Sequence, residues 1–187
     1  MDSRAFLDFL KVAERLKCNT RHSYTSSGRH ESVAEHSWRL TVMAYFMQDE
    51  FPEADIDKVI KMCMFHDMGE AITGDIPAFE KTSADSDNEN HVMEELMDTL
   101  TEPYRTDLKD LFAEMEALET LEAKIYKALD KLEALIQHNE ADLSTWIPLE
   151  YDLQMTYGTE ECSFSEYMKS LRDMVREDSR KKADMDK

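Results

Sequence analysis

The sequence of 187 residues contains little glycine and little proline, with only four residues of each. These two residue types form tight turns and interrupt helices, so their scarcity favours helices joined by short loops. Leu, Met, Glu, Lys and Ala, which are good helix formers, are abundant. We therefore predict an all-α fold. The length suits a single domain, which we place at residues 1–178, followed by a frayed polar tail at 179–187.

Cysteine is also scarce, since Cys18, Cys63 and Cys162 are widely separated and form no CxxC pair. Such a set indicates neither a disulfide framework nor a cysteine zinc site. The longest apolar runs are far shorter than the roughly 18 residues of a membrane span, and the amino-terminal Met-Asp-Ser-Arg lacks a signal-peptide pattern. We expect a cytoplasmic protein without a membrane partner.

Positive charge is in short supply as well. The 22 Lys and Arg residues stand against 41 Asp and Glu residues, which gives a net charge of −19. Nonspecific binding to a nucleic-acid polymer or to an anionic membrane needs a basic tract that releases phosphate counterions, and no such tract is present. A small anionic substrate remains compatible with this charge if a few local cations offset the acidic field.

Hydrophobic periodicity predicts a series of amphipathic helices. We expect them at residues 3–17, 33–48, 56–73, 89–101, 103–117, 119–141 and 163–176. The second of these is apolar around nearly its whole circumference, which is typical of a central, buried helix. The polar segments 18–32 and 77–90 are predicted to be loops, and loops held by a helical scaffold often carry function.

The most informative feature is the pair His66-Asp67 within the helix expected at 56–73. At 3.6 residues per turn, Asp67 falls on the buried stripe of that helix. A buried carboxylate must be paired or bound to a cation, because an isolated buried charge is very unfavourable. With His36 and Asp130 from two other helices, the pair offers two imidazoles and two carboxylates. Such a set suits a divalent ion such as Mn, Co, Fe, Zn or Mg and leaves positions open for water and substrate.

Taken singly, these residues have ordinary structural interpretations. A histidine at the start of a buried helix, such as His36, is more often a core or capping residue than a ligand. Asp130 alone would be a typical solvated partner of Lys127 on the preceding turn. The doublet with its flanking sequence is much more specific.

Three segments together resemble the HD-domain metal-dependent phosphohydrolases, whose metal ligands follow the order H…HD…D. They are Val-Ala-Glu-His at 33–36, His-Asp at 66–67 and Asp-Lys-Leu-Glu at 130–133. The stretch His-Asp-Met-Gly-Glu at 66–70, followed by Thr-Gly-Asp-Ile-Pro at 73–77, is similar to the bacterial 5′-deoxynucleotidase branch.

The resemblance implies a helical bundle with one divalent ion per chain in its central helices, and the release of phosphate from nucleoside (deoxynucleoside in that branch) 5′-monophosphates. It assigns as metal ligands His36, His66, Asp67 and Asp130. It also suggests a homodimer.

Two further carboxylates are candidates for proton transfer. Glu70 lies four residues after His66 and three after Asp67, which places it on the same side of a continuous helix. We assign it to positioning the attacking water or moving a proton. Asp75 matches a functional carboxylate of the family and is assigned to protonating the leaving oxygen or holding the sugar. The ordinary alternative is a turn residue after Gly74.

Phosphate binding in so acidic a protein needs local positive charge. Arg21 matches an arginine that precedes the H…HD…D series in the family, and we predict that it binds phosphate in a fork. Its alternative is an ordinary surface arginine in a polar loop. Lys81 is a second candidate. We also place His22 among the substrate-binding residues. The characterised deoxynucleotidases carry Trp after the matching arginine, where this chain has His22, so the preference between deoxyribose and ribose is left open.

Rival functions within the HD proteins fit the sequence less well. A di-iron HD oxygenase needs further histidines between the doublet and the last ligand, where only His91 lies. HD hydrolases of alarmones or cyclic dinucleotides have additional domains or a Gly-Tyr-Pro signature, which this chain lacks. Two alternatives stay open. One is a phosphomonoesterase or pyrophosphohydrolase acting on another nucleotide or small metabolite, and the other is a non-catalytic helical dimerisation or interaction module.

Overall fold

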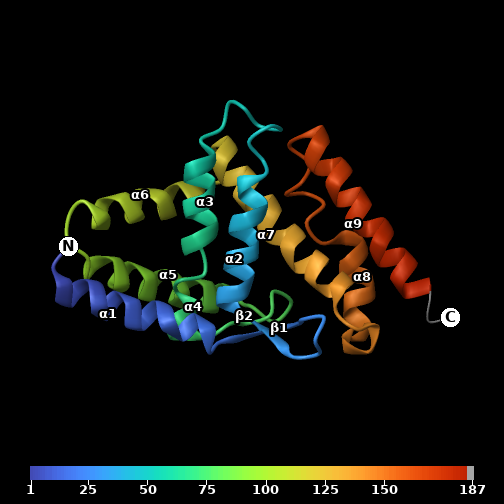
Figure 1. Cartoon of the computed structure of the whole chain (residues 1–187), viewed down its shortest axis with the longest axis horizontal. Helices are drawn as coiled ribbons and strands as arrows, with labels where there is room; N and C mark the ends of the chain where they lie inside the picture. Colours follow the sequence, from blue (N-terminus) through green and yellow to red (C-terminus); the bar gives the residue numbers. More distant parts are fainter. Residues whose placement is uncertain (185–187) are drawn as a thin grey trace.

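The computed structural model describes residues 1–184 and consists mainly of helices (Figure 1). The helices are α1 (Ser3–Glu14), α2 (Val33–Tyr45), α3 (Ile56–Phe65), α4 (Glu70–Thr73), α5 (Ser83–Asp98), α6 (Tyr104–Ala117), α7 (Leu121–Glu140), α8 (Pro148–Thr156) and α9 (Glu166–Asp184). Two 3-10 turns, η1 (Arg15–Lys17) and η2 (Leu143–Thr145), and an antiparallel hairpin of β1 (Thr20–Tyr24) and β2 (His30–Ser32) accompany them. The predicted all-α class is confirmed.

The main core lies where α2, α3 and α7 meet, with α2 and α3 next to each other and α7 crossing them (Figure 1). Many of its members are fully buried apolar side chains from these three helices, including Leu40, Val59, Met62, Ile125, Leu129 and Leu132. Burial of such a side chain contributes about 1.5–3 kcal/mol. The apolar stripes that predicted these helices therefore build the rigid centre of the molecule.

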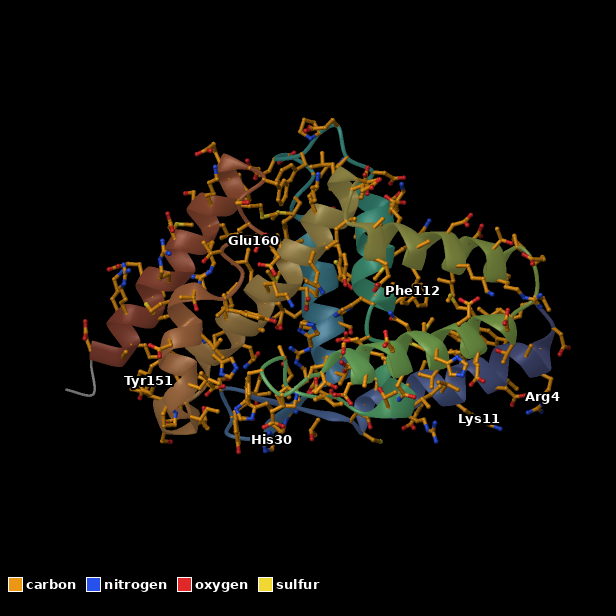
Figure 2. The ribbon with its side chains drawn as sticks, turned by 180° about the vertical axis from the view of Figure 1, so that it is seen from behind. Arg4, Lys11, His30, Phe112, Tyr151 and Glu160 are labelled. Carbon is orange, nitrogen blue, oxygen red and sulfur yellow. The ribbon has the colours of Figure 1, made fainter. Side chains whose placement is uncertain are left out.

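A second cluster joins α1, α4 and α5 near the start of α2. It is formed by the buried residues Leu16, Val33, Met68, Ala71, Met93, Leu96 and Met97. Phe112 of α6 points toward this region in the view from behind and packs against the cluster (Figure 2). Val33 in the first turn of α2 belongs to this cluster, whereas Leu40 and Ala44 further along the helix belong to the main core, so α2 is packed along its length.

The start of α2 is set by a capping box. The Ser32 hydroxyl accepts a hydrogen bond from the Glu35 backbone N–H (3.3 Å), and the Glu35 carboxylate accepts one from the Ser32 backbone N–H (2.9 Å). Arg29 donates two hydrogen bonds to the same carboxylate. This reciprocal arrangement satisfies backbone donors that a helix start leaves free. It places His36 in the first turn of α2, where its side chain is fully buried.

The single helix expected at 56–73 is two helices. α3 ends at Phe65, residues 66–69 form a turn, and α4 begins at Glu70. Gly69 lies so close to α5 that a Cβ there would be 2.8 Å from the Glu89 Cγ. Gly74, with φ of +81°, then ends α4, as the left-handed region favours glycine. The apolar pattern continues across the break, so periodicity alone did not reveal it.

Other differences from the expected elements lie in polar segments. The loop expected at 18–32 contains the β1–β2 hairpin, and the loop expected at 77–90 is shortened because α5 begins at Ser83 behind a Thr82 cap. α8 was not expected. These segments are exposed on one side, so their apolar residues are too few to give a clear period.

The tail expected to be frayed from residue 179 instead continues α9 through Asp184. Ser179 is fully buried, and its hydroxyl lies 2.9 Å from the Asn139 Oδ1 and from the Gln154 Oε1. Residues 185–187 of that expected tail lie outside the described residues. The assignment of residues 1–178 to one domain stays a prediction. No helix within residues 1–184 has the length and apolar character needed to cross a membrane.

Candidate metal centre and adjoining cavities

The four predicted ligands come together from three elements. His36 belongs to α2, His66 and Asp67 to the turn after α3, and Asp130 to α7. The His36 Nε2 lies 3.3 Å from the His66 Nε2 and 3.4 Å from the Asp130 Oδ1. The His66 Nε2 lies 3.0 Å from the Asp67 Oδ2. The ligand atoms therefore lie in one small region, although the residues are far apart in the sequence.

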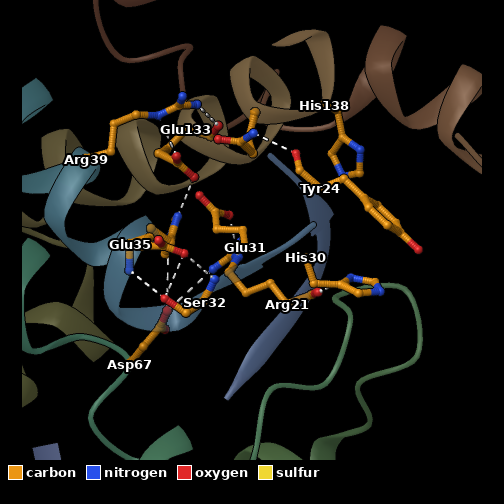
Figure 3. A network of polar contacts seen from close by, with 12 residues as sticks. Arg21, Tyr24, His30, Glu31, Ser32, Glu35, Arg39, Asp67, Glu133 and His138 are labelled. Carbon is orange, nitrogen blue, oxygen red and sulfur yellow. Dashed lines mark hydrogen bonds and ion pairs between the residues drawn. The ribbon is translucent and has the colours of Figure 1, made fainter. Parts of the chain in front are cut away.

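The other ring nitrogen of each histidine is already occupied. The His66 Nδ1 donates to the Cys63 carbonyl oxygen at 2.9 Å, and the His36 Nδ1 donates to the Glu133 carboxylate. Arg39 donates in turn to Glu133 at 2.8 Å (Figure 3). A carbonyl oxygen only accepts, so the proton of His66 sits on Nδ1 and the Nε2 lone pair faces the other ligands. Partners of this kind orient histidines that bind metals.

Charges around the ligands favour a cation between them. Burial raises the pKa of Asp67, but His66, His36 and Arg21 outweigh it and hold that pKa well below its usual range. Burial and Arg21 lower the pKa of His36, yet Glu133 and Asp130 raise it to about 9. A positive charge is thus favoured where the four side chains meet.

The donor set fits a divalent metal ion. Two imidazole nitrogens and two carboxylate oxygens suit borderline and hard divalent cations. The Asp67 Oδ2 is buried and has no hydrogen-bond partner among the described residues, which leaves it free to bind a cation. His36, His66 and Asp67 also offer ligand atoms that all lie within 4.8 Å of one another.

A cavity of about 370 Å³ borders these ligands, and we call it the metal cavity. Arg21, Glu70, Asp75 and Lys81, all predicted from the sequence, are among its lining residues. Arg21 projects from β1 with its Nη1 3.6 Å from the Asp67 Oδ2 and its Nε 3.5 Å from the Glu31 Oε2. Its side chain is only 14% exposed, so it is not an ordinary surface arginine.

Arg21 keeps its positive charge despite burial. Burial lowers the pKa of its guanidinium, but Asp67, Glu133 and other carboxylates raise it further, so the net shift is upward. The Nε finds no hydrogen-bond partner within residues 1–184. A charged fork with a free donor beside the ligands is suited to a phosphate or carboxylate group.

Glu70 lines the cavity, but it does not belong to the same helix as the residues before His66, because that helix is broken. It begins α4, and Asn19 donates to its carbonyl oxygen at 2.5 Å, which ties α4 to the segment before β1. Its carboxyl group is buried, and burial together with Asp67, Asp75 and Glu89 raises its pKa to about 10. Burial also raises the pKa of Asp75. Both groups therefore hold a proton more readily than ordinary carboxylates.

Two lysines on α7 were missed as cavity residues. Lys127 and Lys131 place their Nζ atoms 3.3 Å and 3.5 Å from the Asp130 Oδ2, and both line the metal cavity. The pair of Lys127 and Asp130 considered from the sequence therefore forms, but Asp130 is only 14% exposed, so the pair is largely buried rather than solvated. The signal available in the sequence was the position of these two lysines, one three residues before Asp130 and one directly after it. Lys127 and Lys131 share the single carboxylate of Asp130, whereas Lys81 is paired with the separate carboxylate of Glu89.

His22 lines a second cavity of about 180 Å³ beside the first. Its Nε2 lies 3.0 Å from the Glu150 Oε1, in α8. The two cavities share Arg21, Asp75, Ala78 and Tyr157 as lining residues. The sequence predicted His22 as a substrate contact but gave no sign of Glu150.

Comparisons with known proteins agree with this arrangement. A family model described as HD domain matches residues 13–172. The human 5′-deoxynucleotidase HDDC2 is 32% identical over 142 residues, which cover 74% of this chain and 69% of the human protein. The 5′-deoxynucleotidase hdd1 of Schizosaccharomyces pombe is 32% identical over 165 residues, which cover 77% of this chain and 81% of that protein.

Two solved structures share the fold. A protein described as a predicted metal-dependent phosphohydrolase from Magnetospirillum magnetotacticum MS-1 has a TM-score of 0.79 at 24% identity, covering 96% of this chain and 93% of that one. A conserved hypothetical protein from Pyrococcus furiosus has a TM-score of 0.70 at 27% identity, covering 91% of this chain and 99% of that one.

Proposed function

Because the chain belongs to the HD-domain family, we propose that it is a metal-dependent phosphohydrolase that releases phosphate from nucleoside 5′-monophosphates. The observation that carries this proposal is that four candidate ligand side chains lie together at the edge of one cavity. Positively charged arginine and lysine side chains line the same cavity. Relatives that are 32% identical are named 5′-deoxynucleotidases, which supports a deoxynucleotide as one substrate.

His36, His66, Asp67 and Asp130 would hold the ion. When bound, a divalent ion lowers the pKa of its water and polarises a phosphoryl oxygen. Mn, Co, Fe, Zn and Mg all suit this donor set, and cellular supply decides among such ions. A purely structural role for these residues is disfavoured, because a buried carboxylate oxygen that accepts no hydrogen bond, such as the Asp67 Oδ2, is destabilising without a ligand.

Arg21 binds the phosphate of the substrate. Its guanidinium lies beside Asp67 and keeps its charge, so it is placed to donate two hydrogen bonds to phosphate oxygens. Lys127 and Lys131 add positive charge to the same cavity and offset the carboxylates that would otherwise repel a phosphate dianion. Lys81 has a smaller part, since Glu89 already neutralises it.

Glu70 and Asp75 handle the two protons of the reaction. Hydrolysis forms a bond between a water oxygen and phosphorus and breaks the bond to the 5′ oxygen, so the water loses a proton and the leaving oxygen gains one. A divalent ion held by Asp67 would lower the pKa of the nearby Glu70 carboxyl group. The ionised Glu70 would then accept the proton of the water. Asp75, whose pKa is raised by burial, holds a proton that it can give to the leaving oxygen.

The test is phosphate release from a panel of ribonucleoside and deoxyribonucleoside 5′-monophosphates with Mn, Co or Mg. His66→Ala is expected to lose both bound metal and activity, whereas His91→Ala should keep both, because His91 is an exposed residue of α5. The proposal fails if no panel member is hydrolysed and His66→Ala leaves the metal content unchanged. Hydrolysis of other phosphate esters alone would favour a phosphomonoesterase or pyrophosphohydrolase of different specificity.

We also propose that the protein forms a homodimer through α2. Large apolar residues are exposed along one face of this helix and directly after its end, namely Trp38 (67%), Val42 (38%), Tyr45 (61%) and then Phe46 (68%). Contiguous exposed apolar side chains of this kind typically mark an interface. Light scattering after size exclusion should show a dimer that Trp38→Glu converts to a monomer and that Phe6→Glu, on α1, leaves intact. A monomeric wild-type protein would contradict this.

A cytoplasmic location remains part of the proposal. Cys18, Cys63 and Cys162 are free thiols, as expected for a protein kept in a reducing compartment.

A further inference from the structure

Tyr157 lines both the metal cavity and the second cavity, and no step of the proposed reaction involves it. Its hydroxyl oxygen lies 2.8 Å from the Lys131 Nζ. Lys131 lines the metal cavity but not the second one. The same Nζ is 3.5 Å from the Asp130 Oδ2. The hydroxyl group of Tyr157 therefore lies on the metal-cavity side of its ring, one residue away from a candidate metal ligand.

The contact with Lys131 determines which way the hydroxyl group can donate. Burial and Lys127 lower the pKa of Lys131, but Asp130 and Tyr157 outweigh them and raise that pKa, so the side chain stays a charged ammonium. An ammonium group has donors and no acceptor. Lys131 therefore donates and the Tyr157 oxygen accepts. Within residues 1–184, Lys131 is the only hydrogen-bond partner of this hydroxyl, so its own proton is left for another acceptor.

The surroundings make this hydroxyl a strong donor for an anion. Hydrogen bonds polarise one another, so a hydroxyl that accepts from an ammonium donates more strongly. The Lys131 Nζ also lies 4.9 Å from the centre of the Tyr157 ring, within the range of cation–π attraction. Arg21 and Lys127 line the same cavity and favour an acceptor that carries negative charge. A phosphoryl oxygen has this character.

The position of Tyr157 is set by α9, which packs against α7 and α8 (Figure 1). Arg172 of α9 is only 2% exposed, and its Nε donates to the Tyr157 carbonyl oxygen at 2.7 Å. Its Nη2 donates to the Gln154 carbonyl oxygen at 2.9 Å, so Arg172 satisfies carbonyl groups that the end of α8 leaves free. Gly158 follows with φ of +73°, and a Cβ there would be 2.9 Å from the Lys131 Cβ. The chain beside Tyr157 is thus held against α7 next to Lys131.

From this arrangement we propose that Tyr157 binds the phosphate group of the substrate by donating its hydroxyl proton to a phosphoryl oxygen. The inference rests on the proposed phosphohydrolase function. Lys131 polarises the hydroxyl group, and Arg172 positions the residue that carries it. The free phosphate that hydrolysis releases has the same oxygens, so Tyr157 binds inorganic phosphate as well.

Binding of inorganic phosphate to the protein loaded with Mn is the direct test. Tyr157→Phe removes only the hydroxyl group and keeps the ring. We expect calorimetry to show a phosphate Kd that rises about 10-fold or more, because hydrogen bonds to charged groups have effects of this size. The Kd for Mn should not change, and kcat/KM for a nucleotide substrate should fall by a similar factor. Tyr151→Phe is the matched control and should behave as the wild type, since Tyr151 is an exposed residue of α8.

A second pair of proteins separates direct contact with phosphate from mere positioning of Lys131. In Lys131→Met there is no ammonium left to position, yet the Tyr157 hydroxyl can still donate. We therefore expect Tyr157→Phe, added to Lys131→Met, to weaken phosphate binding by a further threefold or more. A smaller effect would overturn the inference, because Tyr157 would then act only through Lys131. Weaker Mn binding in Tyr157→Phe would overturn it too, since the pair would then serve Asp130.

The same measurements separate this inference from the proposed reaction. If the wild type hydrolyses nucleotides and Tyr157→Phe keeps both its kcat/KM and its phosphate Kd, the inference fails and the phosphohydrolase function stands. If the wild type hydrolyses no nucleotide but binds phosphate through the Tyr157 hydroxyl, the reaction is rejected and the phosphate contact stands. Absence of both hydrolysis and phosphate binding would reject the two together.

Discussion

The Nδ1 of His36 donates a hydrogen bond to Glu133, a carboxylate that is fully buried on α7 three residues after Asp130. One turn of α7 thus supplies both a candidate ligand, Asp130, and the residue that orients a second one. Arg39 donates to the other oxygen of Glu133, so the carboxylate is held from two sides. This pair of residues determines which nitrogen of His36 faces the metal cavity.

Replacement of Glu133 should weaken metal binding without removing a ligand. We expect Glu133→Gln to reduce metal affinity about 10- to 100-fold, because residues that orient metal-binding histidines typically have effects of this size. Titration of the metal-free protein with Mn or Co measures this. The matched control is Glu140→Gln, since Glu140 also binds Arg39 but is half-exposed and does not touch His36. Equal metal affinity of the two variants would show that Glu133 does not orient a ligand.

Metal removal should lower thermal stability. A ligand that binds only the folded state stabilises it by about 2.7 kcal/mol when present at 100 times its Kd. We expect a chelator to lower the Tm of the wild type and added Mn or Co to restore it. In Asp67→Asn, which loses one anionic ligand atom, the Tm should respond much less to either treatment. The same metal-dependent shift in Tm for both proteins would place the ion elsewhere.

Arg21→Lys should impair turnover although the positive charge is kept. The lysine ammonium cannot donate the two parallel hydrogen bonds that a guanidinium offers to phosphate. We expect kcat/KM to fall about 10- to 100-fold, which corresponds to the loss of a charge-assisted hydrogen bond of about 1.5–3 kcal/mol. Arg4→Lys on the exposed face of α1 is the control and should be neutral. An unchanged kcat/KM in Arg21→Lys would mean that charge alone suffices.

The capping box of α2 should make stability depend on pH. The hydrogen bonds from Arg29, and to a smaller extent the one from the Ser32 backbone, lower the pKa of Glu35 from about 4.5 to about 2. Because the folded-state pKa is below the unfolded value, this stabilisation is fully present above pH 4.5 and is lost as the pH falls toward 2. Chemical denaturation of the wild type and Glu35→Gln should therefore show a stability difference at pH 7 that shrinks by pH 3.5. A difference that does not depend on pH would contradict this.

Much of the fold followed from local patterns in the chain. Apolar spacing located α2, α3 and α7, because the same stripes that repeat along the sequence form the main core. The turn at residues 66–69 escaped this approach, since the buried Met68 and Ala71 continue the apolar pattern past the break. Capping side chains such as Thr82 were the available signal for the early start of α5.

Membership of the HD-domain family, inferred from three short motifs, is confirmed by the family model. The motifs also named the residues whose side chains converge in the structure, although their roles as ligands and catalysts stay proposals. Contacts between distant segments were beyond this approach. Nothing near His22 in the sequence points to Glu150 or His138.

The sequence by itself determined the helical class, the family and the chemical type of the candidate site, because helix periodicity and ligand motifs depend on residues that are close in the chain. Tertiary structure decided which atoms face the metal cavity, how far carboxylates such as Glu70 shift in pKa, and which polar atoms remain without partners beside His22. These properties arise from burial and from charges on other elements. They therefore exist only once α2, α7, α8 and the hairpin have packed together.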